Sequence, residues 1–386
     1  MNVVYVGQDF PTCFSKSIML VGPTPREDSV PSWRPEALRI LEELGYDGVV
    51  FVPESSDGVR CTSYDGQIDT EERMLNMADC IVCWIPRDMA TMPALTTNDE
   101  YGCWKNSGKV VLGAPDSAVR VRYQEYYAQK LCIPTHTTLK DTLVTAVERL
   151  GDGALRFGGE CNVPLYIWQT PSFQQWYKNL LIAGNRLDGA RALWTFRVGK
   201  NLSYVFLWVL HVDIYIASED RHKTNEVVLA RPDIAGVVAY RRKDTFLDTE
   251  VVLIREFRSP VSNTHGFVYE VPGGSSFKPG GNPLQLAADE CSEETGLHID
   301  ISRMKQVGSR QLLATLSAHQ AHLFSVELTQ EEIGILRADF GTAHGVVGET
   351  ERTYVEIKTV REILQGDSGL DWSMIGMILS AIEQVE

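Results

Sequence analysis

The sequence lacks the features of several specialised protein classes. None of its apolar runs reaches the roughly 18 residues of a membrane span, and the closest candidate, residues 204–216, contains His211 and Asp213. Basic residues are outnumbered, with 36 Lys and Arg against 51 Asp and Glu and a net charge of −15, which disfavours binding to nucleic-acid backbones. The first residues show no basic flank and no small-residue cleavage site, so no secretory signal is predicted. We therefore expect neither a membrane nor a nucleic-acid partner.

The sequence also lacks a regular spacing of cysteines. The 8 cysteines do not follow the rhythm of a disulfide scaffold, so we expect reduced thiols and a cytoplasmic protein. Cys80 and Cys83 form a CxxC pattern inside the apolar run ADCIVCWIP, which is typical of a buried strand rather than of a turn that opens a helix. Buried structural thiols are therefore favoured over a redox or metal site.

What the sequence does contain is enough material for two folded domains. Apolar residues make up 44% and charged residues 23% of the 386 residues, which is the balance of an ordinary globular protein. The chain is longer than the roughly 100 to 200 residues of a typical domain. We divide it into a first domain at residues 1–150, a helical connector at 151–195 and a second domain at 196–386.

The two expected domains differ in their patterns of apolar residues. Residues 17–113 alternate apolar runs with amphipathic stretches, which predicts an α/β fold with a parallel sheet flanked by helices. From residue 196 onward, β-branched and aromatic runs predict an α+β fold with a mixed sheet. Pro283 and Gly296 mark the start and the end of a helix in that second domain.

Glycine, proline and arginine gather near the predicted strand ends of the first domain. Gly22 and Pro23 follow the apolar strand SIMLV, at the carboxyl end of a strand, where open α/β sheets bind ligands. Arg26, Arg34 and Arg87 also lie just after strands or in loops. Three such arginines suit an anionic nucleotide, although a solvated surface position is the alternative for each of them.

Two acidic residues of the first domain are candidates for catalysis. Glu100 lies in LTTNDEYG, where Thr96 or Thr97 is expected to begin a helix, so its carboxylate would stand in the first helical turn. Glu71 lies on the preceding predicted helix. One carboxylate can attack an anomeric carbon while a second handles protons. The alternative is a Glu that simply interacts with the helix dipole.

These residues belong to a series of motifs that resembles a known superfamily. The series comprises, in order, GPTPR, SWRPEAL, GVVFVPE, YDGQIDTEE, ADCIVCWIPRD and TTNDEYG. Over about residues 17–130 it resembles the nucleoside 2-deoxyribosyltransferase-like superfamily. The resemblance implies that Glu100 is the nucleophile and that Glu71 assists the base. Ala94 stands where these enzymes often have an Asp that holds the sugar hydroxyl. This departure favours another sugar, or a nucleotide held by its phosphate through Arg26 or Arg34, and it makes hydrolysis as plausible as base exchange.

A glycine-rich loop followed by an acidic helix is the most informative feature of the second domain. In VPGGSSFKPGGNPLQLAADECSEETGL, helical spacing places Glu290, Glu293 and Glu294 on one face. Three carboxylates repel one another, and a hard divalent cation such as Mg²⁺ (or Mn²⁺) relieves that repulsion and polarises diphosphate oxygens. The alternative is a solvated acidic helix face.

The end of this segment resembles the Nudix box, whose core ends in REUxEExGU, with U an aliphatic residue. The match runs from Glu290 to Leu297 and includes the metal-binding acids. Asp289 replaces the usual Arg, which normally orients a catalytic Glu, and Gly281 stands where an earlier Glu is expected. The resemblance therefore implies a Nudix hydrolase fold whose activity is weakened or retuned.

The flanking segments resemble the ADP-ribose and nucleotide-sugar pyrophosphatase branch of that family. In VVLIREFRSPVSNTHGFVYEVPGG, the resemblance implies that Arg255 and Arg258 face the substrate phosphate or a neighbouring subunit, and that the Gly273 carbonyl contacts the metal. In VVGETERTYVEI, it makes Glu349 or Glu351 the base that activates water. A solvated loop position is the alternative for these acids.

The leading hypothesis is a nucleotide-processing hydrolase with two activities. The second domain would cleave an ADP-ribose-like compound with Mg²⁺, and the first would cleave an N-glycosidic bond through Glu100. Removing the base from NAD would yield ADP-ribose for the second site. One alternative is a nucleotide sensor with one inactive domain, and another is a salvage deoxyribosyltransferase with a regulatory Nudix domain. Both resemblances imply a homodimer.

Overall fold

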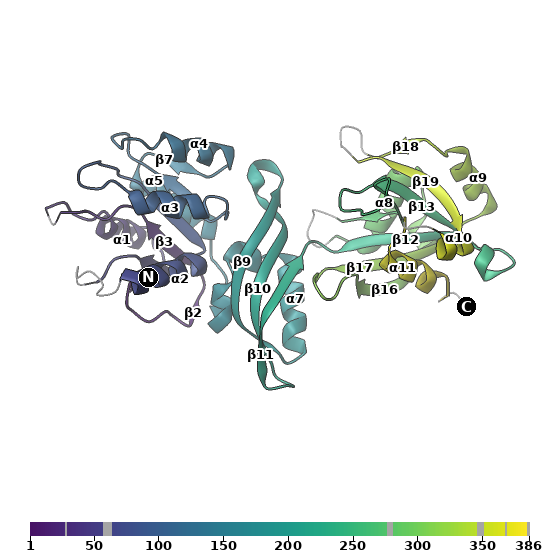
Figure 1. The fold of residues 1–386 in the computed structure, drawn as a ribbon, viewed down its shortest axis with the longest axis horizontal. Helices are drawn as coiled ribbons and strands as arrows, with labels where there is room; N and C mark the ends of the chain where they lie inside the picture. Colours follow the sequence, from purple (N-terminus) through teal and green to yellow (C-terminus); the bar gives the residue numbers. More distant parts are fainter. Residues whose placement is uncertain (28, 57–63, 276–280, 346–350, 367–368, 384–386) are drawn as a thin grey trace. The chain divides into compact units, whose positions relative to one another are not determined.

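The chain divides into two compact units, Met1–Leu229 and Ala230–Glu386. The computed structural model describes all residues except 28, 57–63, 276–280, 346–350, 367–368 and 384–386 (Figure 1). The first unit contains a parallel sheet with helices and the second contains a mixed sheet with helices, so the predicted α/β class is confirmed at that level. Within the described part of the chain, none of the helices combines the length and apolar composition that a membrane crossing requires.

The first unit is built on a six-stranded parallel sheet in the order β1-β4-β3-β5-β6-β7. Its strands are β1 (Asn2–Tyr5), β3 (Ser17–Val21), β4 (Val49–Val52), β5 (Cys80–Trp84), β6 (Val110–Gly113) and β7 (Thr135–His136). The residues of β3, β4, β5 and β6 are all buried, as expected when helices cover both faces of a parallel sheet. Cys80 and Cys83 lie within buried β5, as their apolar surroundings predicted.

Helices cover the two faces of this sheet. They are α1 (Arg34–Glu43), α2 (Tyr64–Met77), α3 (Leu95–Trp104), α4 (Arg122–Lys130) and α5 (Leu139–Leu150). Apolar residues of α1 and α5 pack with Ile18, Leu20 and Val82 on one face. Residues of α2, α3 and α4 pack on the other face with Met19 and Ile81. The alternation of side chains along each strand therefore divides the core into two layers.

The segment after the sheet forms a second, antiparallel sheet within the first unit. This segment contains β8 (Arg156–Phe157), η1 (Gly158–Asn162), α6 (Leu165–Trp168), α7 (Pro171–Ile182), β9 (Arg186–Val198), η2 (Lys200–Leu202), β10 (Tyr204–Ile216) and β11 (Arg221–Ala230). The short strand β2 (Cys13–Phe14) lies earlier in the chain, between β1 and β3. β2 pairs with β8, and the three long strands pair in the order β11-β10-β9. A fully buried ion pair between Arg156 and Asp79 (2.5 Å) ties β8 to the start of β5.

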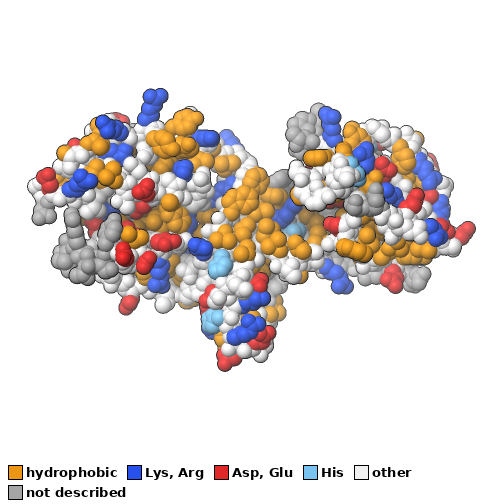
Figure 2. Space-filling model, viewed as in Figure 1, with side chains coloured by type: hydrophobic (Ala, Val, Ile, Leu, Met, Phe, Trp, Pro, Cys, Tyr) orange, Lys and Arg blue, Asp and Glu red, His pale blue; other side chains and the backbone are white. Residues whose placement is uncertain are grey.

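This three-stranded sheet differs from the expected organisation. We placed a helical connector at 151–195 and the second domain from residue 196 onward, whereas β9 begins within that connector and the compact unit extends to Leu229. The aromatic side of α7 explains the difference, because Phe173 packs on the fully buried Trp208 of β10 at 5.6 Å between ring centroids. Trp194 and Phe196 of β9 remain exposed, and Figure 2 shows apolar side chains gathered over β9 and β10.

The second unit contains a mixed sheet in the order β16-β17-β12-β13-β19-β18, with β14 on β13 and β15 on β12. Its strands are β12 (Ile234–Arg241), β13 (Glu250–Phe257), β14 (Phe267–Glu270), β15 (Gly273–Gly274), β16 (Lys305–Gln311), β17 (Gln320–Glu327), β18 (Ala343–His344) and β19 (Thr353–Thr359). β12 and β17 run parallel, whereas the other pairs are antiparallel. The sheet is therefore mixed, as predicted.

Helices cover both faces of this second sheet as well. They are η3 (Phe246–Asp248), α8 (Pro283–Thr295), η4 (Ile301–Arg303), α9 (Gln330–Ala338), α10 (Val360–Gln365) and α11 (Trp372–Glu383). Apolar residues of α8 and α9 form one core layer, and those of α10 and α11 form the other. The side chain of Asn282 caps α8 by accepting a hydrogen bond from the Leu284 N–H, and Gly296 ends the helix at φ +71°. The predicted bounds of this helix are confirmed.

Candidate functional site

Glu100 lies in the second turn of α3, one turn later than we expected. The helix begins at Leu95, and its N-cap is Ala94, whose backbone is left-handed (φ 57°) and whose side chain makes no capping hydrogen bond. This conformation is unfavourable for Ala and is more common for Asp or Asn. Ala94 is also the position where the deoxyribosyltransferase-like enzymes often have Asp. Backbone strain of this kind concentrates at functional sites, so the start of α3 is a candidate ligand edge.

The carboxyl group of Glu100 is set in an unusual environment. Burial, and then the negative charge of Glu71, raises the pKa of Glu100 to about 7, against the opposing charge of Arg34. Burial also raises the pKa of Glu71, although Gln67 Nε2 donates a hydrogen bond to Glu71 Oε1 at 2.8 Å and Arg34 opposes the rise. Residues from α1, α2 and α3 thus form one electrostatically coupled group. One carboxyl group that is protonated near neutral pH beside another suits a nucleophile and proton-donor pair.

Arg34 bonds to groups of the protein, whereas we expected it to bind the phosphate of a nucleotide. The side chain is almost fully buried. It donates hydrogen bonds to the carbonyls of Leu20 and Gly22 and forms an ion pair with Glu54 at 2.5 Å. It therefore fixes the loop after β3 while keeping a positive charge near Glu71 and Glu100. We regard Arg34 as a positioning residue.

Gly22 and Pro23 are explained by packing. A Cβ on Gly22 would overlap the Trp84 carbonyl and the ring of Trp33. The indole N–H of Trp33 donates a hydrogen bond to the Pro23 carbonyl at 3.2 Å. A glycine is needed here because β3, β5 and α1 meet closely, which is a different reason from the close approach of a ligand.

The other two arginines differ in exposure. Arg87 is buried and donates hydrogen bonds to the Arg120 carbonyl (2.7 Å) and to Asn98 Oδ1 (2.5 Å). Because Asn98 lies two residues before Glu100, Arg87 anchors α3. Arg26 is exposed, and its backbone N–H donates a hydrogen bond to the Thr91 carbonyl. Of the three arginines, Arg26 is the one that presents its side chain to solvent and retains the geometry to meet a phosphate.

In the second unit, a group of carboxylates surrounds Glu294. Its side chain is 5% exposed and accepts a hydrogen bond from the Gly273 N–H at 2.8 Å. Burial raises the pKa of Glu294 well above its usual range, and the charges of Glu290, Glu351 and Glu256 raise it further. The protein therefore holds several acids close enough to repel one another.

Glycines of β15 let the acidic helix approach the sheet. A Cβ on Gly274 would lie 2.5 Å from Glu290 Oε1, and one on Gly273 would lie 2.5 Å from the Ala235 carbonyl. We expected the Gly273 carbonyl to contact a metal; in the structure it is the Gly273 N–H that contacts the acid group. Gly274 is the residue that gives Glu290 room beside the backbone.

Glu256 is a member of this group that the sequence motifs did not identify. It lies on β13, is 6% exposed, and its buried Oε2 lies 2.8 Å from Nη2 of Arg258. Burial raises its pKa to about 7, and Arg258 opposes that rise. The available signal was alternation along the strand, because Glu256 shares a face with Val252 and Ile254. An acid on the apolar face of a strand is a candidate functional residue.

The arginines of β13 and the loop after it have protein partners. Arg258 pairs with Glu256 at 2.8 Å, Glu270 at 3.0 Å and Glu351 at 3.7 Å. Its guanidinium therefore joins the acid group, whereas we expected it to meet a substrate phosphate or another subunit. Arg255 instead stacks against the rings of Phe267 and Tyr354.

Two predicted acids stand outside this group. Glu293 is exposed on α8 and is not among the charges that act on Glu294. Glu349 lies outside the described residues. Among those residues that are described, no group of three or more His, Cys, Asp or Glu has the spacing of a metal site. The acids are therefore close enough to interact but do not form a preassembled set of ligands.

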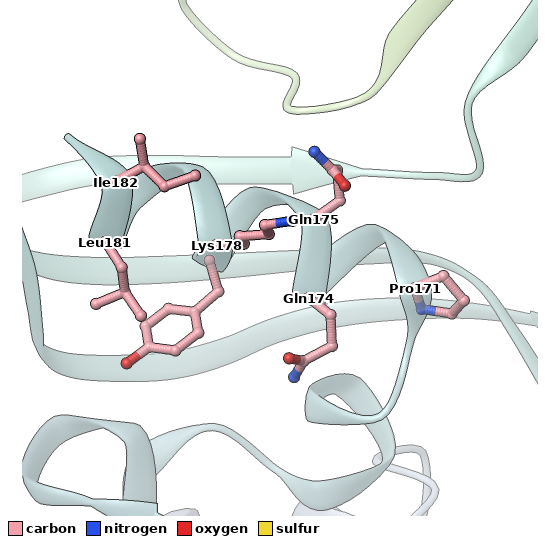
Figure 3. Close-up of a pocket in the computed structure, with 7 residues that line it drawn as sticks. Pro171, Gln174, Gln175, Lys178, Leu181 and Ile182 are labelled. Carbon is pink, nitrogen blue, oxygen red and sulfur yellow. The ribbon is translucent and has the colours of Figure 1, made fainter.

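A recess on the surface of the first unit lies away from both acid groups. It has a volume of about 740 Å³ and follows the surface of α7, where Lys178, Leu181 and Ile182 contribute to its lining (Figure 3). None of the acids discussed above lines it. Because catalysis needs reactive groups at the ligand, we place the candidate active sites at the acid groups and not at this recess.

Comparison of the chain with protein-family models found no match, and comparison with curated proteins found none either. The two resemblances therefore rest on the sequence motifs quoted above. The activities that they imply are proposals, and the geometry of the acid groups is the evidence that bears on them.

Proposed function

We propose that the chain is a nucleotide-processing hydrolase. Its second unit would cleave a nucleoside diphosphate linked to a second group, such as ADP-ribose, with Mg²⁺ or Mn²⁺. The observation that carries this proposal is the buried carboxylate of Glu294, which interacts with Glu290, Glu256 and Glu351 beside the glycines of β15. Keeping several acids together away from water costs free energy, and a function that uses their charge explains why they are there.

The carboxylates of this acid group are suitable ligands for a hard divalent cation. Carboxylate oxygens are the ligands that Mg²⁺ prefers, and Glu256 brings a second buried carboxylate close enough to act on the charge of Glu294. Glu256, Glu290 and Glu294 are the residues that would hold the ion. When bound, Mg²⁺ would polarise the diphosphate oxygens and offset their charge.

The remaining residues of the group would bind and orient the substrate. Arg258 is about 40% exposed and pairs with three carboxylates, so its guanidinium can exchange one of them for a phosphate. Glu351 lies just before β19 with its side chain about 45% exposed. Its carboxylate would accept a proton from the attacking water.

The test is a product analysis with the full-length protein. ADP-ribose is incubated with and without Mg²⁺ or Mn²⁺, and the products are separated and identified by mass spectrometry. We expect AMP and ribose 5-phosphate only when the metal is present. ADP-ribose that stays intact under every condition would show that the hydrolase proposal is wrong. Tight calorimetric binding without turnover would instead support a nucleotide sensor.

The first unit supports a second candidate function, cleavage of an N-glycosidic bond. The specific observation is the coupling of Glu100 and Glu71 near Arg34, with the pKa of Glu100 raised to about 7. Once ionised, the carboxylate of Glu100 would attack the anomeric carbon and displace the base, to which Glu71 would donate a proton. Water would then hydrolyse the glycosyl ester on Glu100 and release the sugar. If the substrate is NAD, the product ADP-ribose would supply the second unit.

This second candidate is tested with NAD and deoxynucleotides. Release of nicotinamide or of a free base, followed by chromatography, is the expected result. Base exchange between two nucleosides would instead favour the salvage deoxyribosyltransferase alternative. If neither release nor exchange occurs, the first unit is not a glycosidase. Gel filtration with light scattering tests the proposed homodimer.

A further inference from the structure

Two arginines of the first unit meet at the edge of the parallel sheet where β5 and β6 begin. Arg149 of α5 donates hydrogen bonds to the carbonyls of Val110 (2.9 Å) and Gly108 (2.7 Å). Arg197 of β9 packs its guanidinium on Gly108 and on the ring of Tyr166, at 4.3 Å from the centroid. Glu100 lies on α3, which follows the opposite end of β5, so this pair of arginines belongs to neither acid group.

Gly108 permits this arrangement. Its backbone has φ +75°, and a Cβ would lie 2.5 Å from the guanidinium carbon of Arg197. The guanidinium is therefore held between a glycine backbone and an aromatic ring, two surfaces that contribute no negative charge. This position fixes the plane of the guanidinium, as is common where arginine binds a flat anionic group.

The positive charge of Arg197 has no carboxylate partner in the part of the chain that the structure describes. The groups that act on the charge of Arg197 are Tyr166 and Arg149, and no described carboxylate is among them. Asp79, which lines the same region, is paired with Arg156 at 2.5 Å. Two neighbouring cations without a counter-ion repel each other, and burial increases the cost of that repulsion.

Hydrogen-bond donors are also left over. Arg197 donates to the Tyr166 hydroxyl, but its Nε and Nη2 are buried with no partner among the described residues. Buried donors are nearly always satisfied, so an orphaned pair calls for a bound ion or water. Beside them lies a small recess of about 50 Å³, lined in part by Gly108, Arg149, Tyr166 and Gln169.

We propose that this recess binds a small oxyanion, such as phosphate or a carboxylate, through Arg197 and Arg149. A guanidinium edge matches two oxygens of such a group, and the second arginine adds its charge. Because the site joins α5 and β6 to α6 and β9, an anion there would stabilise the attachment of the three-stranded sheet to the parallel sheet.

The test uses inorganic phosphate with the full-length protein in EDTA, which removes metal-dependent binding at the acid group. Titration calorimetry measures affinity, and thermal unfolding in phosphate is compared with unfolding in chloride at equal ionic strength. We expect a phosphate-dependent rise in melting temperature. The Arg197→Gln substitution should weaken phosphate binding by about tenfold or more, because it removes a charged hydrogen-bond donor. Acetate in place of phosphate shows whether a carboxylate is accepted equally.

Two further variants make the result interpretable. Arg191→Gln changes an exposed arginine on the same strand and should leave phosphate affinity unchanged. Arg149→Gln, at an exposed position on α5, should also weaken binding and serves if the Arg197→Gln protein does not fold by circular dichroism. The absence of a phosphate effect in the parent protein would overturn the proposal. So would equal affinity in the parent and in a folded variant of either proposed ligand.

Discussion

Both units bury carboxylates, but the arginines beside these carboxylates differ in burial and in their bonding partners. In the first unit, Arg34 is almost fully buried and bonds to backbone carbonyls and Glu54, so its charge is a permanent part of the scaffold. In the second unit, Arg258 is partly exposed and shared among three carboxylates. The comparison indicates that the cation of the first site is fixed in the scaffold, whereas the cation of the second site is partly exposed and outnumbered by carboxylates, whose charge a further cation would balance.

The largest expected effect is on the first site. Glu100→Gln removes the proposed nucleophile without changing the shape of the side chain much, so we expect loss of N-glycosidic cleavage by roughly a thousandfold. Release of base from NAD or a deoxynucleotide is the measurement. Glu42→Gln, at an exposed position on α1, is the matched control. Equal activity in the parent and in the Glu100→Gln protein would remove Glu100 from the mechanism.

The second site should respond to charge removal in two ways. Glu294→Gln removes a proposed metal ligand, so metal-dependent hydrolysis of ADP-ribose should fall on the order of 100-fold. Burial raises the pKa of Glu294, so the neutral Gln should leave the melting temperature in EDTA unchanged or higher. Glu331→Gln, on the exposed side of α9, is the control. Lower stability together with lower activity would instead indicate a structural role for Glu294.

Substitutions of the two glycines of β15 should have different effects, one on activity and the other on folding stability. In Gly274→Ala, the atoms nearest to the new Cβ would be those at the end of the Glu290 side chain, so the fold should persist while hydrolysis falls by about tenfold. In Gly273→Ala, the Cβ would meet the backbone of Ala235, which should destabilise the protein by about 1 to 3 kcal/mol. Urea unfolding and the ADP-ribose assay measure the two effects. The reverse pattern would contradict the proposed place of Glu290.

Both acid groups should make stability fall as pH rises. The pKa of Glu100 and that of Glu256 are each raised to about 7, chiefly by burial. A raised carboxyl pKa contributes stability that is complete below about pH 4.5 and is lost as pH passes through about 7. We expect the free energy of unfolding in EDTA to fall by on the order of 1 to 3 kcal/mol between pH 5 and 8. The slope should be smaller in Glu256→Gln and unchanged in Glu331→Gln.

The sequence predicted features that depend on local pattern. Alternating apolar runs predicted the parallel sheet, and Pro283 and Gly296 predicted the bounds of α8, because these signals lie within one element. Glu256 could not be assigned to the acid group in this way, since β13 and α8 are brought together only by the packing of the sheet. The partners of Arg34 could not be predicted for the same reason, because they are the loop after β3 and Glu54, which the fold brings to it.

Substitution of Glu293 should have the smallest effect, and it tests directly which acids of the second site take part in metal binding. Helical spacing places Glu290, Glu293 and Glu294 near one another but does not say which side of α8 the sheet covers. The structure buries Glu294 and exposes Glu293, so Glu293→Gln should change metal-dependent hydrolysis by less than about threefold, whereas Glu294→Gln abolishes most of it. Rates and Mg²⁺ titrations of the two variants are compared at one pH. If Glu293→Gln lost as much activity as Glu294→Gln, the side chain of Glu293 would have to turn inward to bind the ion. The metal ligands would then be the acids expected from the motif.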